Sequence, residues 1–425
     1  MKLQKIHFIL FQIVLIILFA SCRSTDPEVF TGYAYDPAGV TETSDREIIP
    51  QHKRTIGFLS DGVWISNEFP GSRASDIYRT DDFQYTIEIR PEISPVNNSP
   101  WYGFKIWSSD TARVTVELAY PEEGRQRYTP KISTNGGMDW KPVDPKNYHS
   151  GSSGILELDV SQDTLWVSAQ EIYTTEHLSV WLDSLSEKSY IRNSTAGYSH
   201  QGRPVSLLKI SEPSSKPLKG VIIVYNRQHP PEIPGYIAGL KFLETVAGDT
   251  KLASRFRDYF EVWAFPMMNP DGADNGHWRA NAAGVDLNRD WNYFRQPETA
   301  AVQKTLLPLK EKPNRKVFYA IDFHSTGRTL FYPIIKEIQT FPLHFTYRWA
   351  DEIKAALPEV DLDVEPFDIV SPIAKNWTFK TFGADAVTFE VWDEMPRDQV
   401  RQLGVRSAEL FMKLMIEEYQ NHIRN

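Results

Sequence analysis

The chain has 425 residues, of which 41% are hydrophobic and 13% aromatic, and its formal net charge is -9. This length exceeds one typical domain and suits two, each with a core of its own. The negative charge without a long basic run argues against nucleic acid as a partner, and the single cysteine excludes an internal disulfide bond.

The first predicted element is a signal peptide at residues 1–21. Lys2 and Lys5 make a positive start, and Ile6 to Ala20 is an almost wholly apolar stretch that is short for a membrane span. A lone Cys22 directly after small residues favours lipidation over a transmembrane anchor or a plain secretory signal. We therefore expect a bacterial lipoprotein, anchored by lipid to a membrane of the cell envelope, in the periplasm or at the cell surface.

Residues 22–50 are polar and proline-containing and predict a tether, and residues 51–175 predict a β-sandwich domain. Short runs such as Tyr85–Arg90 and Arg113–Leu118 alternate with period two, and clusters of Gly, Pro, Asn and Asp separate them. This pattern is typical of an all-β sandwich. The region has no cluster of His, Cys and carboxylates, so a structural support is expected, with a docking module as the alternative.

Residues 176–425 predict an α/β domain, because apolar runs alternate with helical patterns. The buried strands are expected at Val221–Tyr225, Phe260–Phe265, Lys316–Ile321 and Ala386–Val391. The helices are expected at Ile233–Val246, Thr299–Leu309, Phe345–Leu357 and Val405–Ile423. This alternation predicts a mixed, mostly parallel sheet with helices on both faces, and such sheets bind ligands at the carboxyl ends of their strands.

Two histidines and two glutamates accompany these strands. His229 follows the first strand by four residues, Glu232 stands at the expected start of the next helix, His324 is expected just after its strand, and Glu390 lies in the last one. Two imidazoles and one carboxylate make a catalytic zinc site with an open position, and a further carboxylate can move protons. His-x-x-Glu alone is a weak signal that arises often by chance.

Two longer motifs resemble the zinc metallocarboxypeptidase family, which includes carboxypeptidase A and the cytosolic carboxypeptidases. They are Phe265-Pro-Met-Met-Asn-Pro-Asp-Gly272 and His277-Trp-Arg-Ala-Asn-Ala-Ala-Gly-Val-Asp-Leu-Asn-Arg-Asp-Trp291. Gly202–Ile210 is similar to the family's opening strand, and the resemblance runs from about Trp181 to the end of the chain. The His-Pro-x-Glu form and the preceding β domain resemble the cytosolic branch most.

The resemblance implies a role for each site residue. His229, Glu232 and His324 would bind one Zn²⁺, and Glu390 would act as the general base. Arg279 would stabilise the oxyanion of the tetrahedral intermediate.

Three further residues receive roles from the same resemblance. Asn288 and Arg289 would hold the free terminal carboxylate of a peptide substrate, because a guanidinium fork matches a carboxylate bidentately. Asp286 would orient His229. Ordinary ion pairing is the alternative for the Asp and Arg residues. A carboxylate clamp would make the protein an exopeptidase.

Two positions depart from the family pattern. The mobile tyrosine of carboxypeptidase A-like enzymes falls near Asp368, and no tyrosine stands between Phe367 and Glu390. The residue at the family's side-chain pocket, fifteen positions before the base (390 − 375 = 15), is Lys375. A lysine there favours an acidic C-terminal side chain. A solvated surface lysine is the alternative, and Arg328 is a second candidate cation.

These observations predict an extracytoplasmic zinc carboxypeptidase that removes single C-terminal residues from peptides, cell-wall stem peptides among them. The alternative enzyme is a zinc amidase or deacylase acting on a carboxylate-bearing small molecule or stem peptide. A non-catalytic, lipid-anchored binding protein is the third hypothesis, and the presence of all four zinc-site groups argues against it. The long segment from Asn269 to Trp291 favours peptides.

Overall fold

The computed structural model describes residues 42–424 except 123, 214–215, 217 and 367–368. The predicted signal peptide, Cys22 and most of the predicted tether lie outside this part of the chain, as does Asp368. In the part described, no helix combines the length and the apolar character needed to cross a membrane.

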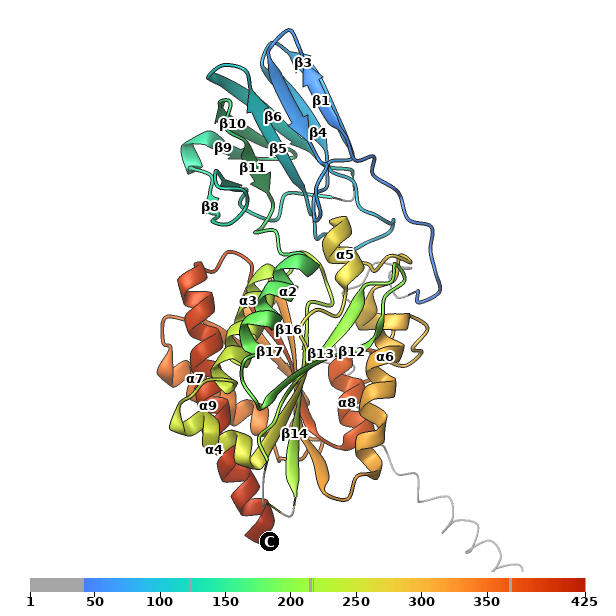
Figure 1. Ribbon diagram of the computed structural model, residues 1–425, viewed down its shortest axis with the longest axis vertical. Helices are drawn as coiled ribbons and strands as arrows, with labels where there is room; N and C mark the ends of the chain where they lie inside the picture. The colour runs from blue at the N-terminus through green and yellow to red at the C-terminus, as the bar shows by residue number, and fades with distance from the viewer. Residues whose placement is uncertain (1–41, 123, 214–215, 217, 367–368, 425) are drawn as a thin grey trace, which may run out of the picture.

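Two β-sheets form the N-terminal domain at the top of Figure 1. The six-stranded sheet has the order β1 (Thr55–Phe58), β2 (Val63–Ser66), β5 (Gly103–Ser108), β11 (Leu165–Ser168), β7 (Lys131–Ser133) and β8 (Lys141–Pro142). The five-stranded sheet has the order β3 (Asp76–Asp81), β4 (Gln84–Glu88), β6 (Ala112–Ala119), β10 (Gly154–Val160) and β9 (Tyr148–Ser150). Alternate residues such as Leu156 and Leu158 are buried, as the period-two pattern requires. The predicted β domain is thus confirmed.

An eight-stranded sheet forms the second domain. Its order is β12 (Ile191–Tyr198), β13 (Pro204–Ile210), β15 (Phe260–Phe265), β14 (Lys219–Asn226), β16 (Arg315–Thr326), β19 (Asp385–Trp392), β17 (Thr329–Pro333) and β18 (Leu362–Val364). Four of its seven strand pairs are parallel: β14 with β15, β14 with β16, β16 with β19, and β17 with β18. The prediction of a mixed, mostly parallel sheet is confirmed.

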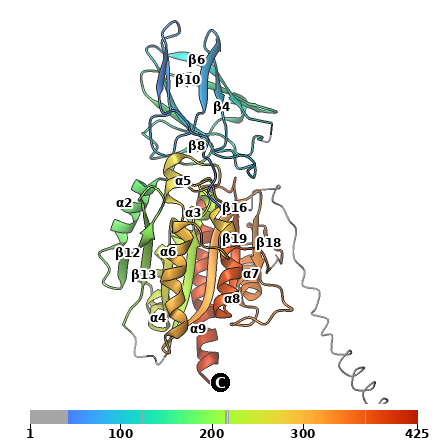
Figure 2. The ribbon, with the colours of Figure 1, turned by 90° about the vertical axis from the view of Figure 1, so that its right-hand side faces the viewer.

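Helices cover both faces of this sheet (Figures 1 and 2). One face of β14 presents Ile222 and Val224 to the core shared with α3 (Ile233–Val246), α4 (Lys251–Tyr259), α7 (Phe345–Ala356) and α9 (Arg397–Arg424). The other face presents Val221 and Ile223 to the core shared with α6 (Pro297–Leu306) and α8 (Ala374–Phe382). Two short helices, α2 (Thr175–Leu185) and α5 (Pro270–Asn275), lie near the β domain. Burial on both faces explains why these strands are apolar without alternation.

Two predicted boundaries differ most from the observed ones. His324 lies inside β16 and not after it, because β16 continues to pair with β19 through the polar residues His324 to Thr326, beyond the end of its pairing with β14 at Phe323. Helix α9 begins at Arg397 and not at Val405, although five of the residues from Arg397 to Gly404 are charged or polar. Arg397 at its start pairs with Glu171 of the β domain. In both cases tertiary pairing extends an element beyond its apolar pattern.

Residues 42–50, the end of the predicted tether, pack against folded parts of the chain. The Arg46 N–H donates to the Ala283 carbonyl at 2.7 Å, and its guanidinium donates to the Ser94 carbonyl at 2.8 Å. The Ile49 N–H donates to the Glu92 carbonyl at 2.7 Å. This segment therefore joins the two domains.

Ion pairs also join the β domain to the α/β domain. Arg127 Nε lies 2.9 Å from Asp393 Oδ2, and Arg397 Nε lies 2.7 Å from Glu171 Oε1. Asp393 follows β19 directly, so the β domain sits at the carboxyl ends of the parallel strands (Figure 2). Ligands of parallel sheets bind at this end.

Candidate metal centre and substrate cavity

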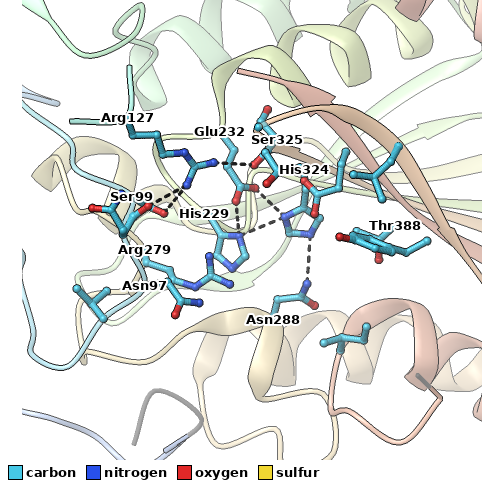
Figure 3. A pocket seen from close by; sticks show the side chains of 18 of the residues that line it. Asn97, Ser99, Arg127, His229, Glu232, Arg279, Asn288, His324, Ser325 and Thr388 are labelled. Atoms are coloured by element: carbon cyan, nitrogen blue, oxygen red, sulfur yellow. Dashed lines mark hydrogen bonds and ion pairs between the residues drawn. The ribbon is translucent and has the colours of Figure 1, made fainter. Parts of the chain in front are cut away.

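His229, Glu232 and His324 converge as the sequence predicts, and all three are buried. Glu232 Oε1 lies 2.8 Å from His229 Nδ1, and Glu232 Oε2 lies 2.7 Å from His324 Nδ1. The two Nδ1 atoms are 3.2 Å apart (Figure 3). Two nitrogen ligands of a tetrahedral zinc ion, each at about 2.0–2.1 Å, are separated by roughly 3.3 Å. The three ligand atoms therefore fit zinc.

A carboxylate backs each histidine on the side away from this cluster. His229 Nε2 lies 2.8 Å from Asp286 Oδ1, and His324 Nε2 lies 2.9 Å from Asp322 Oδ2. Such pairing fixes the ring orientation and leaves Nδ1 for a metal. Burial alone would raise the pKa of Asp286, but Arg279 and His229 outweigh it and hold this pKa well below its usual range.

Gly235 allows the helix that follows Glu232 to approach the strand that carries His324. A Cβ atom at this position would lie 2.1 Å from the His324 carbonyl oxygen. The Gly235 N–H donates to Ser325 Oγ at 2.7 Å, which joins the first turn of α3 to β16. Glu232 is the residue before α3 and the prolines 230 and 231 precede it, so its side chain points at the cluster from the start of the helix.

A cavity of about 800 Å³ opens over the three ligands. Residues of both domains line it: Pro95 to Ser99 and Arg127 come from the β domain, and the site residues come from the α/β domain (Figure 3). The β domain thus forms one side of the cavity at the carboxyl ends of the parallel strands.

Glu390 lines the same cavity from β19, where it is the register partner of His324 on β16. Its Oε2 atom is buried and has no hydrogen-bond partner among the described residues. Burial raises the pKa of the Glu390 carboxyl to about 7 despite the opposing effect of His324. A carboxylate with this pKa and a vacant acceptor atom suits a general base.

The predicted oxyanion donor Arg279 and the predicted carboxylate-binding residues Asn288 and Arg289 line the cavity together. Arg279 Nε donates to Asp286 Oδ2 at 2.6 Å. Asn288 and Arg289 belong to a single 3-10 turn (Leu287–Arg289) that the Asp286 side chain caps by accepting from the Asn288 N–H. The Asp286 carboxylate therefore contacts Arg279, the turn that carries Asn288 and Arg289, and His229.

Lys375, the residue predicted for the side-chain pocket, is not a solvated surface lysine. Its side chain is buried in α8, its Nζ donates to the Pro333 carbonyl at 3.3 Å, and it is not among the described residues that line the cavity. Arg328, the second candidate cation, lines the cavity and pairs with Asp363 and Glu365.

The sequence did not reveal Asp322 or Arg127 as site residues. Asp322 stands two residues before His324 on one strand, and this spacing on one strand face was the available signal. Arg127 donates to the Ser325 carbonyl at 3.3 Å and to Ser99 Oγ at 3.0 Å, and no local pattern in the β domain marks it.

Comparisons with known proteins agree with this geometry. Residues 178–360 match the family model described as zinc carboxypeptidase. Cytosolic carboxypeptidase 6 of Mus musculus is 24% identical over 280 residues, which cover 60% of this chain and 52% of that protein. Cytosolic carboxypeptidase 2 of Xenopus tropicalis is 31% identical over 359 residues, which cover 72% of this chain and 37% of that protein. The chain thus spans about half or less of these relatives.

Solved bacterial structures share the fold. A metallo-carboxypeptidase from Burkholderia cenocepacia superposes with a TM-score of 0.69 at 20% identity, covering 82% of this chain and 97% of that one. A metallo-carboxypeptidase from Pseudomonas aeruginosa, in complex with (2-guanidinoethylmercapto)succinic acid, superposes with a TM-score of 0.69 at 20% identity, covering 84% and 99%.

Proposed function

We propose that this protein is a zinc-dependent carboxypeptidase that releases the C-terminal residue of peptides, since residues 178–360 match the family model described as zinc carboxypeptidase. The observation that carries the proposal is the convergence, in one cavity, of the His229–Glu232–His324 cluster, Glu390 and the Asn288–Arg289 turn. The cluster and Glu390 suit hydrolysis, and the Asn288–Arg289 turn suits recognition of a free carboxylate.

The chain's own residues divide the chemistry between them. Zinc, when bound by the three ligands, lowers the pKa of a water molecule and polarises a carbonyl oxygen. Glu390 takes the proton from the attacking water through its vacant carboxylate oxygen and returns it to the leaving amine. Arg279 donates to the oxyanion that forms on the scissile carbonyl. Asn288 and Arg289 hold the substrate's terminal carboxylate and so set the position of the cut.

The direct test is to incubate the zinc-loaded protein with a mixed library of peptides and muropeptides and to measure the masses that are lost. Loss of single C-terminal residues is expected. Release of an acyl group, or cleavage of a small-molecule amide with no loss from peptides, would favour the amidase or deacylase alternative.

Replacing Arg289 by alanine is expected to weaken kcat/KM for peptides with a free carboxylate by roughly 10- to 100-fold, because a hydrogen bond to a charged group contributes about 1.5–3 kcal/mol. Most of the change should appear in KM, since substrate and transition state share the contact. C-terminally amidated peptides provide the control. If the parent cleaves amidated and free peptides equally well, the carboxylate clamp does not exist.

We propose Lys375, which is buried, as a residue that determines substrate specificity. If its ammonium attracts acidic C-terminal side chains, Lys375→Asp shifts the preference towards basic residues. The measurement is the ratio of kcat/KM for peptides ending in Glu and in Lys. An unchanged ratio in a folded variant removes Lys375 from the specificity pocket and leaves Arg328 as the cation to examine.

The location that we propose is the cell envelope, with Cys22 as the site of a lipid anchor. The supporting features are the positive start, the short apolar stretch and the small residues before the lone cysteine. Metabolic labelling with a fatty acid tests it: the parent should be labelled and Cys22→Ala should not. Absence of label from the parent would rule out the anchor.

A further inference from the structure

A carboxylate of the β domain holds the loop that carries Arg279. Glu92 is fully buried and lies in the segment that follows β4. Its Oε2 accepts from the Trp278 N–H at 2.7 Å, and its Oε1 accepts from the Arg279 N–H at 3.0 Å and the Ala280 N–H at 2.7 Å. Three consecutive amides of the α/β domain thus end on one side chain of the other domain.

The charge of Glu92 is retained in this buried place. Burial opposes ionisation, but His277, the buried Arg73 and the loop amides together lower the pKa of Glu92 below its usual value. Arg73 also reaches the loop, because its guanidinium donates to the Gly276 carbonyl at 3.4 Å. Hydrogen bonds from backbone N–H groups to a carboxylate are shorter and stronger than neutral ones. The loop is therefore held firmly from the β-domain side.

The backbone that Glu92 holds includes Arg279, whose side chain is linked to the reaction centre. Arg279 Nε donates to Asp286 Oδ2 at 2.6 Å, and Asp286 Oδ1 lies 2.8 Å from His229 Nε2. A shift of the Arg279 backbone moves the donor that faces the oxyanion, and a misplacement of about 1 Å can cost about 10²-fold in rate. Glu92 itself does not line the cavity.

We propose that Glu92 is a positioning residue that sets Arg279 for oxyanion stabilisation, and that the β domain is thereby a working part of the reaction centre. The inference rests on the proposed carboxypeptidase activity. It gives the β domain a role other than passive support, since the α/β domain alone leaves three amides next to Arg279 without their acceptor.

A double-mutant cycle in the full-length, zinc-loaded protein tests this role, with Glu92→Gln, Arg279→Ala and the double variant. A carboxamide keeps the size of Glu92 but offers one acceptor oxygen in place of two. Glu92→Gln is expected to lower kcat about 10- to 100-fold with little change in KM or zinc content. In the Arg279→Ala background the same change should cost less than about threefold, because the group that Glu92 positions is gone. Equal losses in both backgrounds would overturn the inference.

A matched control separates positioning from general stability. The side chain of Asp61 in the β domain is also a little-exposed carboxylate, but its partners Arg79, Phe83 and Tyr85 all belong to that domain. Asp61→Asn should lower the melting temperature and leave kcat of the folded protein unchanged. If Asp61→Asn lowers kcat as much as Glu92→Gln, the effect is one of stability and the inference fails. If Glu92→Gln does not fold, Glu92→Asp, which is shorter, replaces it in the cycle.

Hydrogen exchange gives a readout that does not need catalysis. In Glu92→Gln the amides of Trp278, Arg279 and Ala280 should exchange faster than in the parent, while those of β15 should not change. Unchanged exchange in this loop overturns the inference. A parent that binds zinc but cleaves no peptide overturns the proposed function instead, and the exchange result then still decides whether Glu92 holds the loop.

Discussion

Replacing Glu390 by glutamine is expected to lower kcat by about 10²- to 10⁴-fold, because a carboxamide cannot take a proton from water. The side chain keeps its size, and Oε2 has no hydrogen bond in the described part of the protein to lose. Folding, zinc content and KM should therefore stay close to those of the parent. Steady-state kinetics with a free-carboxylate peptide, together with metal analysis of the same samples, measures the effect.

The exposed Glu352 on α7 provides a control for this change, since Glu352→Gln makes the same chemical replacement far from the cavity. It should leave kcat as it is. Activity of Glu390→Gln within about tenfold of the parent, at full zinc content, would show that another group moves the proton.

Replacing His324 by alanine is expected to abolish both zinc binding and activity. A catalytic zinc site holds its ion with three protein ligands, and His324 is one of the three groups that converge here. Because metal binding stabilises the folded protein, zinc should raise the melting temperature of the parent and not that of the variant. Metal content after dialysis and thermal unfolding with and without zinc measure the two effects.

His149 is exposed on β9 of the other domain, so His149→Ala should bind zinc and respond to it as the parent does. If His324→Ala retains stoichiometric zinc after dialysis, the ion is held elsewhere and the proposed centre is wrong.

Much of the α/β domain could be predicted from local patterns, because its central strands are buried on both faces. Phe260–Phe265 and Ile233–Val246 have the bounds that the sequence predicts. The cluster of His229, Glu232 and His324 could be predicted from strand ends together with the motif around Asn288 and Arg289.

The parts that could not be predicted depend on contacts between distant segments. Glu92 reaches Trp278 across 186 residues of chain, and Arg127 reaches Asp393 across 266. Neither Glu92 nor Arg127 belongs to a functional sequence motif, because the sequence of the β domain shows only the patterns of strands and turns. Strand β17, which lies between β19 and the edge strand β18, was missed as well, since its five residues show no distinctive alternation.

The contact at Gly235 has a consequence for how the chain can vary through evolution. Every residue other than glycine would place an atom 2.1 Å from the His324 carbonyl oxygen and push apart the two elements that supply Glu232 and His324. The position bears no reactive group and does not line the cavity, yet a side chain there would disturb the placement of two zinc ligands. A search for essential residues that considers only chemical reactivity would therefore miss Gly235.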